Sequence, residues 1–290
     1  MEVFIVFKIK FARTFDFAIM SKNNLDHVLE DYFVTTKNAF CIADGITREL
    51  VTGKPLKYPT TKEEALEILK DYPNPSGATL AAKTCAEKFI SYISKRDVSK
   101  MSTDIIYKVM KAVNKDISKI NEGRKIDYLV NDEYACCAVG GVFQDEVLYA
   151  FAVGDCKMML LDENLDIVAD TSSSTAYNDY KDSYKMKCFR NADWMTNKEF
   201  RVYIRKTMRN NIWYKLLKRH TFGVLNGDTK ALYFIERYKF DLSKVKYILA
   251  FSDGCVDCLQ TKEQIASVLE NPEHVGEERH EKTLIIYERI

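Results

Sequence analysis

The sequence has 290 residues, of which 47% are hydrophobic, enough to form the core of one large domain or of two small ones. Its 43 basic and 42 acidic residues give a formal net charge of +1, so no overall field favours nucleic acid or an anionic membrane surface. The apolar residues 1–10 include charged side chains and are too few to span a bilayer. We therefore expect neither nucleic acid nor a membrane as a partner.

The first half of the chain predicts strands followed by two long helices. Residues 1–10 are typical of a strand, and residues 31–36 and 38–43 of a hairpin. Pro73 and Pro75 then mark a break. After it, apolar residues recur every three or four positions over 77–96 and 103–120, which predicts two amphipathic helices.

In the second half the period changes to that of strands. The tight turns between them favour antiparallel pairing, and the helices are too few for a doubly wound parallel sheet. We expect a single domain over residues 1–290, of the α+β class and built as a layered sandwich. Its predicted elements are strands at 134–143, 147–153 and 157–161, a loop or flap at 169–190, a basic helix at 193–217, strands at 233–240 and 245–251, a helix at 262–269 and a strand at 282–290.

Two compositional features receive a structural interpretation. The basic stretch from Arg201 to Arg209 contains interleaved apolar residues and is typical of a solvated helix face. Eight cysteines are present without paired zinc spacing, and the lone Cys255-Val256-Asp257-Cys258 favours a structural role over a redox or metal role. Thiols inside apolar runs are typical of a reducing compartment, so we expect a cytoplasmic protein, and we expect it to be a monomer.

Three apolar runs end on an aspartate next to a glycine, at Asp44, Asp155 and Asp253. A buried strand that ends in this way delivers a carboxylate to the edge of its sheet. Together with Glu30 and Asp31, these residues predict a cluster of hard oxygen ligands for a divalent metal. The alternative for each one is a turn former or a helix cap.

These motifs resemble, in order and over nearly the whole chain, those of the metal-dependent protein phosphatases of the type 2C family. The resemblance is carried by Glu30-Asp31, Ala43-Asp44-Gly45, Gly77-Ala78-Thr79-Leu80-Ala81 at a helix start, residues 135–143 with the run 148–155 that ends in Gly154-Asp155, Phe251-Ser252-Asp253-Gly254, and Glu281-Lys282-Thr283-Leu284-Ile285.

The resemblance implies a four-layer α-β-β-α sandwich with two central antiparallel sheets. It also implies two Mg²⁺ or Mn²⁺ ions, with a third and weaker site, and a metal-bridging water that attacks phosphorus. By analogy, Asp44 bridges both ions and the carbonyl of Gly45 is a further ligand. Glu30 holds one ion and Asp31 orients a bound water, whereas Asp253 holds the other ion and pairs with Asp155 at the third site.

The sequence departs from the family pattern at three places. The last metal-binding aspartate is replaced by His280, with Glu281 beside it, so His280 or Glu281 is a ligand, or His280 is only a strand-edge residue. The family's phosphate-binding arginine before Glu30 is missing, and the nearest cation is Lys22. A lysine lacks the bidentate fork of an arginine. After Asp44-Gly45 the chain continues as Ile46-Thr47-Arg48-Glu49 instead of a turn that contains Gly and His, so no histidine is available as the acid for the leaving group. Arg48 is a candidate phosphate clamp, or alternatively forms a surface pair with Glu49.

The sequence therefore predicts a metal-dependent serine/threonine protein phosphatase whose substrate partner is a phosphorylated protein. Two alternatives remain. The first is a pseudophosphatase that binds phosphoproteins as a regulatory module, motivated by His280 and the missing arginine. The second is a phosphohydrolase for a small molecule, with a flap that contains Tyr177, Tyr180 and Tyr184.

Overall fold

The computed structural model describes residues 7–15, 29–46, 70, 73–128, 131–171, 202–217, 219, 221–277 and 281–290. Its strands form two five-stranded sheets in which all identified neighbours are antiparallel. Sheet A has the order β1 (Phe7–Phe15), β10 (Lys282–Arg289), β9 (Tyr247–Phe251), β6 (Lys157–Leu161) and β7 (Ile167–Asp170). Sheet B has the order β2 (Tyr32–Thr35), β3 (Ala39–Ile46), β4 (Ala135–Gln144), β5 (Val147–Val153) and β8 (Glu236–Asp241).

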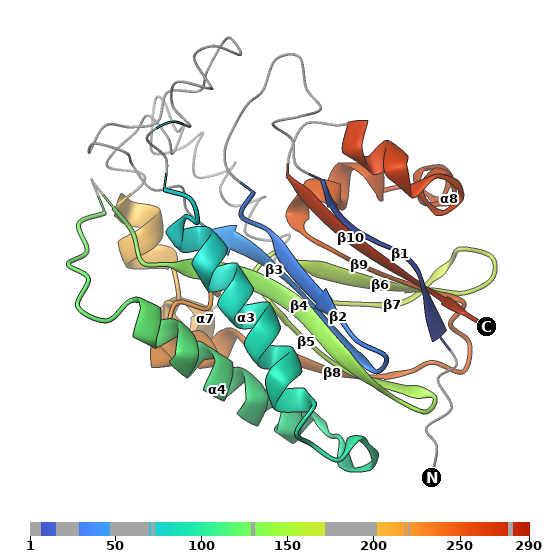
Figure 1. Cartoon of the computed structure of the whole chain (residues 1–290), viewed down its shortest axis with the longest axis horizontal. Helices are drawn as coiled ribbons and strands as arrows, with labels where there is room; N and C mark the ends of the chain where they lie inside the picture. Colours follow the sequence, from blue (N-terminus) through green and yellow to red (C-terminus); the bar gives the residue numbers. More distant parts are fainter. Residues whose placement is uncertain are drawn as a thin grey trace.

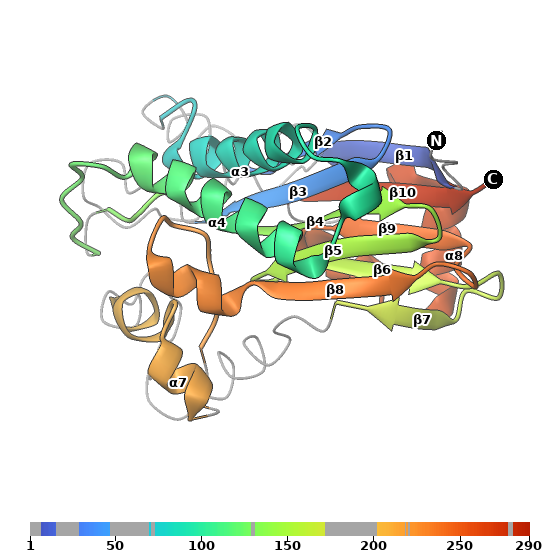
Figure 2. The same cartoon turned by 90° about the horizontal axis from the view of Figure 1, so that it is seen from below.

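Helices cover the outer face of each sheet (Figures 1 and 2). Helices α3 (Gly77–Ile93) and α4 (Thr103–Ile120) pack on sheet B, and α8 (Lys262–Glu270) packs on sheet A. The predicted α-β-β-α sandwich with two antiparallel sheets is therefore confirmed. The other described helices are short: η2 (Val98–Lys100), η3 (Ile204–Met208), α7 (Ile212–Leu216), η4 (Thr229–Phe234), η5 (Asp253–Cys258) and η6 (Pro272–Glu277).

Strand β4 shows why a continuous apolar run is needed at the centre of this sandwich. Alternate side chains of a strand point to opposite faces. Val139 belongs to the core between the sheets, and its neighbour Ala138 belongs to the core under α3 and α4. Both faces of β4 are covered, so it carries no polar alternation.

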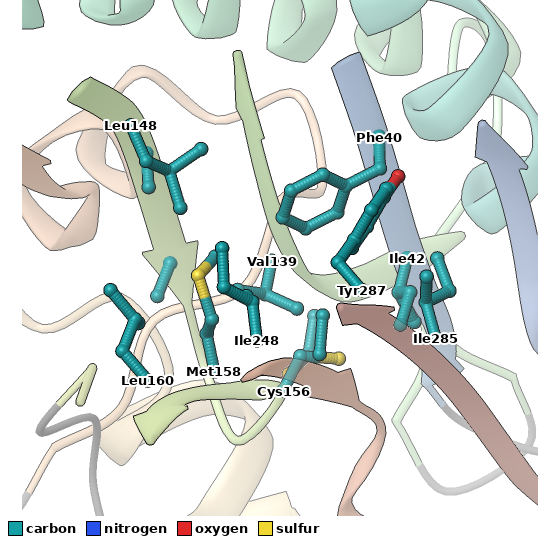
Figure 3. Close-up of a cluster of buried hydrophobic side chains, with 14 of the residues drawn as sticks. Phe40, Ile42, Val139, Leu148, Cys156, Met158, Leu160, Ile248, Ile285 and Tyr287 are labelled. Atoms are coloured by element: carbon teal, nitrogen blue, oxygen red, sulfur yellow. The ribbon is translucent and has the colours of Figure 1, made fainter. Parts of the chain in front are cut away.

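The core between the two sheets is aromatic and aliphatic (Figure 3). Phe40 of sheet B and Tyr287 of sheet A meet with their ring centroids 5.2 Å apart, and Phe143 lies 5.1 Å from Tyr287. Aromatic pairs at such separations stabilise a core beyond the area that they bury. In the part of the chain that is described, no helix is both long and apolar enough to cross a bilayer.

The predicted helix starts are explained by side-chain caps. The hydroxyl of Ser76 accepts from the backbone N–H of Thr79, and that of Ser102 accepts from Ile105. Thr261 and Gln264 form a reciprocal capping box at the start of α8. These caps fix where each helix begins against its sheet.

Three element boundaries differ from the prediction. Strand β1 continues to Phe15, because its pairing with β10 extends from Arg289 to Lys282, with a register shift between Ile9 and Phe11. The segment expected to be a loop from Ala169 begins within strand β7, which pairs with β6. The strand expected from Tyr233 begins only at Glu236, because the side chain of Asp228 caps the helical turn η4 before it. The remaining predicted flap and residues 193–201 of the predicted basic helix lie outside the described residues. The described part of that helix is interrupted, because η3 ends at Met208 and α7 begins only at Ile212.

A buried ion-pair cluster joins the segment around η3 to the loop before β4. Arg209 donates to both oxygens of Asp132, from Nη1 at 2.7 Å and from Nη2 at 3.0 Å, and Arg205 contacts the same carboxylate. Although burial opposes ionisation, the two guanidinium groups hold the pKa of Asp132 below its ordinary value. The prediction of a solvated face was wrong for Arg205 and Arg209, which are 6% and 8% exposed.

Candidate metal centre

The strand pairing brings four strand ends to one end of sheet B and sheet A. Tyr32 at the start of β2 pairs with Ala43 near the end of β3, so Glu30 and Asp31 come next to Asp44. The end of β5 lies on the far side of β4 from β3, because Val153 pairs with Ala138 of β4. In sheet A, Phe251 at the end of β9 pairs with Leu284 of β10, which brings Asp253 towards Glu281. Antiparallel register therefore gathers the predicted acidic residues within each sheet, and the packing of the two sheets brings the two groups together.

The electrostatic interactions of Asp44 indicate that these carboxylates are its neighbours. Burial raises the pKa of Asp44 well above its ordinary value, and the negative charges of Asp31, Asp253, Asp155 and Glu281 raise it further. We call these five residues, together with Glu30, whose charge acts on Glu281, the acidic cluster. Like charges gathered in this way are unfavourable on their own and favour a cation.

Asp31 lies at the seam between the two sheets. It belongs to the sheet B side, and its Oδ2 accepts from Ser252 Oγ at 2.7 Å and from Thr283 Oγ1 at 2.8 Å, both on the sheet A side. Burial raises the pKa of Asp31 to about 6, and the charge of Asp155 adds to this rise, against the opposing effect of the two hydroxyl donors. Thr283 Oγ1 also lies 2.9 Å from Thr14 Oγ1 of β1, so the contact reaches the edge strand.

Glu30 is fixed by the start of helix α3. The hydroxyl of Ser76, the cap of that helix, donates to Glu30 Oε1. Glu30 is only 2% exposed, although Asp44 and Asp155 are half-buried and Asp253 is exposed. The cluster therefore grades from a buried inner side at Glu30 and Asp31 to an open outer side at Asp253.

Glu281 turns its carboxylate towards the main chain of the neighbouring acidic pair. Its Oε1 accepts from the backbone N–H groups of Glu30 and Asp31, each at 2.5 Å. Burial, followed by the charge of Asp31, raises the pKa of Glu281 well above its ordinary value.

Two cysteines border the cluster but remain thiols. Burial raises the pKa of Cys137 and of Cys156 well above the ordinary value, and the charges of Asp155 and Asp44 contribute to both shifts. Because the thiolate is the form that binds metal, these raised pKa values favour carboxylate and carbonyl oxygens as the donors. Such donors fit Mg²⁺ or Mn²⁺.

Within the described residues, no three Asp, Glu, His or Cys side chains form a complete metal-binding group. The candidates His280 and Arg48 lie outside those residues, so no contact is assigned to either one. The other candidates, Glu30, Asp31, Asp44, Gly45, Asp155, Asp253 and Glu281, all lie at this end of the sandwich. The carboxylate and carbonyl oxygens suit a hard cation. Some of these groups would have to move closer together to coordinate it.

The glycines of the two Asp-Gly motifs are required by close backbone approaches. A Cβ on Gly45 would lie 2.7 Å from the carbonyl carbon of Ala78 and 2.8 Å from the carbonyl oxygen of Glu30. A Cβ on Gly254 would lie 2.1 Å from the carbonyl oxygen of Glu281. Each glycine therefore lets one acidic segment pack directly against another.

We expect Gly45→Ala and Gly254→Ala each to lower the free energy of unfolding by about 1–3 kcal/mol or more, because backbone atoms must move apart. Urea unfolding of the two variants measures the change. Lys111→Ala, on the exposed face of α4, is the control and should change it by less than about 0.5 kcal/mol. A change as small as the control's in both glycine variants would contradict these close approaches.

Sequence reasoning missed the hydroxyl residues that hold the carboxylates, namely Ser76, Ser252, Thr283 and Thr14. Ser252 and Thr283 are themselves letters of the Ser-Asp-Gly and Lys-Thr motifs, so the signal was present in the sequence. The structural role expected for the Cys255–Cys258 spacing agrees with the burial of both residues. Cys258 Sγ accepts from Lys282 Nζ, and Cys255 Sγ donates to the carbonyl of Thr283.

Comparison of the whole structure with solved proteins identifies the fold. The Mycobacterium tuberculosis serine/threonine phosphatase PstP/Ppp aligns over 98% of this chain and 99% of its own, with a TM-score of 0.54 and 12% identity. The serine/threonine phosphatase Stp1 from Staphylococcus aureus aligns over 98% and 95%, with a TM-score of 0.54 and 12% identity. The chain has the type 2C phosphatase fold.

A further similar structure is the catalytic domain of PstP in complex with two manganese ions, at 13% identity and a TM-score of 0.54, covering 98% of both chains. The sequence matches no protein-family model and no curated protein. The likeness to the type 2C phosphatases therefore rests on the fold, and the predicted resemblance in architecture is confirmed.

Proposed function

We propose that this chain is a metal-dependent serine/threonine protein phosphatase. One observation carries the proposal: the charged groups that shift the pKa of Asp44 are four other carboxylates, gathered at one end of a type 2C sandwich. A phosphate ester brings further negative charge, so such a site can bind one only when a multivalent cation is also present. The substrate class that we infer is a phosphorylated protein in the cytoplasm, with this chain acting as a monomer.

Residues of the acidic cluster would hold Mg²⁺ or Mn²⁺. We infer that Asp44, Glu30 and the Gly45 carbonyl bind one ion, that Asp44 and Asp253 bind a second, and that Asp155 contributes with Asp253 to a third. A bound divalent ion neutralises phosphate charge and lowers the pKa of its water towards neutrality. His280 and Arg48 remain candidates for the last ligand and for the phosphate clamp.

Asp31 has a separate role in this proposal. Its Oδ2 accepts from the hydroxyls of Ser252 and Thr283. A carboxylate held in this way would orient a metal-bound water next to the phosphate. The hydroxyl contacts hold it in one orientation.

The test is hydrolysis of an aryl phosphate and of a phosphothreonine peptide by purified protein, with Mn²⁺, with Mg²⁺ and with chelator. We expect metal-dependent turnover that falls at least about 100-fold in Asp253→Asn, because a metal ligand is lost. Asp257→Asn, at an exposed position of the same short helix η5, is the control and should keep its activity. Turnover in chelator, or an unchanged rate in Asp253→Asn, would contradict the proposal.

The position of Glu281 favours a second candidate, a pseudophosphatase that binds phosphoproteins. Its Oε1 accepts from two backbone N–H groups, and the family's last metal-binding aspartate is replaced by His280. A folded protein that shows no turnover with any metal, but binds the phosphothreonine peptide saturably, would establish this candidate in place of the first.

A further inference from the structure

The carboxylate of Glu281 occupies a backbone position that usually binds a small anion. Successive backbone N–H groups that point to one place form a concave anion site, called a nest. Here the N–H groups of Glu30 and Asp31 both point to Glu281 Oε1, at 2.5 Å. The side chain comes from residue 281, so the nest and its anion are 251 and 250 positions apart in the sequence.

The two N–H groups lie where the sheet does not provide acceptors. Residues 30 and 31 precede β2, whose first pair is Tyr32 with Ala43. Both residues are almost fully buried, at 2% and 3% exposed, so water does not replace the missing acceptors. Buried backbone donors need a partner, and Glu281 supplies it for both.

Glu281 is itself held in place by its neighbours in the sequence and in space. The next residue, Lys282, is 1% exposed and donates from Nζ to the carbonyl of Val275 at 3.0 Å. Gly254 leaves room for the carbonyl of Glu281, which a Cβ would approach to 2.1 Å. These contacts hold the backbone of Glu281 in place, so that its carboxylate can reach the nest.

The consequence is a reciprocal connection across the seam between the sheets. On the sheet B side, the carboxylate of Asp31 accepts from Ser252 and Thr283. On the sheet A side, the carboxylate of Glu281 accepts from the backbone N–H of Asp31. The direction of both acidic side chains at positions 30 and 31 depends on this main chain.

We propose that Glu281 is a positioning residue for the Glu30–Asp31 pair, acting as a hydrogen-bond acceptor instead of as a metal ligand. The functional part of the inference rests on the phosphatase activity proposed above. An acceptor oxygen is sufficient for this role, so a carboxamide can replace the carboxylate. A carboxylate that binds the metal, by contrast, loses most of its electrostatic attraction for the ion when it becomes a carboxamide.

The experiment compares Glu281→Gln, which keeps the acceptor oxygen, with Glu281→Ala, which removes it. Glu288→Ala, near the other end of β10, is the matched control. The first readout is amide hydrogen exchange of the peptide that contains residues 30 and 31, in metal-free protein. The second is Mn²⁺ affinity by calorimetry, and the third is kcat and KM for a phosphothreonine peptide.

We expect exchange at residues 30 and 31 to accelerate at least about tenfold in Glu281→Ala and to remain close to the control in Glu281→Gln. Mn²⁺ affinity and kcat should fall at least about tenfold in Glu281→Ala, and Glu281→Gln should restore most of that loss. Equal losses of Mn²⁺ affinity in the two variants, with exchange unchanged, would overturn the proposal and make Glu281 a ligand.

The exchange readout separates this proposal from the phosphatase activity itself. If the unaltered chain neither binds Mn²⁺ nor turns over substrate, the proposed function fails, but accelerated exchange in Glu281→Ala alone still supports the positioning role. If Glu281→Ala exchanges like the control, the positioning role fails whatever the activity.

Discussion

Asp44→Asn is expected to stabilise the metal-free protein at pH 7 while it abolishes phosphatase turnover. The carboxylate of Asp44 is desolvated and repelled by four other acidic groups, and the amide removes that repulsion without changing the shape of the side chain. We expect the free energy of unfolding to rise by about 1–2 kcal/mol, which is the usual trade between stability and function at a charged site. Chemical unfolding in chelator measures the rise.

The pH dependence of stability gives the same prediction a second readout. The pKa is raised to about 6 for Asp31 and well above its ordinary value for Asp44, whereas both groups titrate near pH 4 when the chain is unfolded. Between these values the folded state holds more protons than the unfolded state. Stability therefore falls as pH rises from about 4 through about 6, by about 1.4 kcal/mol per pH unit for each such group.

Asp44→Asn should flatten this slope, and saturating Mn²⁺ should remove it in the unaltered chain, because the bound ion favours the charged carboxylates. Asp170→Asn, at the exposed end of edge strand β7, is the control and should leave the slope unchanged. If the metal-free protein became steadily more stable from pH 4 to pH 7, repulsion within the acidic cluster would not destabilise the folded state, contrary to this prediction.

Asp132→Ala is expected to lower the free energy of unfolding by about 3–5 kcal/mol. The substitution leaves the guanidinium groups of Arg205 and Arg209 buried without the carboxylate that they share. Removing one partner of a buried ion pair has an effect of this size, because the remaining charge is not solvated. Urea unfolding of the purified variant measures it.

The matched control is Asp104→Ala, which breaks the exposed pair with Arg237, whose Nη1 lies 3.2 Å from Asp104 Oδ1. An exposed pair contributes at most about 1 kcal/mol. If the two aspartate variants had equal stability, the cluster around Asp132 would be solvated in solution, contrary to its burial.

The sequence could predict the acidic cluster because its members follow from strand ends. Asp44, Asp155 and Asp253 each close an apolar run, and antiparallel pairing places such ends at one edge. The pattern of strands and amphipathic helices predicted a layered α+β sandwich, and its four layers were implied by the family resemblance. The strand ends and the layered arrangement depend on local periodicity, which a single sequence displays directly.

The contacts that orient those carboxylates could not be predicted in the same way. The bond from Thr283 to Asp31 and the bonds to Glu281 join residues about 250 positions apart, and no local pattern encodes them. The burial of Arg205 and Arg209 was missed for a related reason. An arginine facing water and an arginine facing a buried aspartate have the same local sequence, and only the position of Asp132 distinguishes them.

The reciprocal connection between Asp31 and Glu281 also determines when the metal centre can form during folding. Contacts between residues so far apart close very long loops, and such contacts form after local helices and hairpins. The β2–β3 hairpin can assemble early, but its acidic pair acquires an orientation only after β10 has joined β9 and the two sheets have docked. We therefore expect a divalent ion to slow the unfolding of the folded protein more than it accelerates folding, because its ligands converge late.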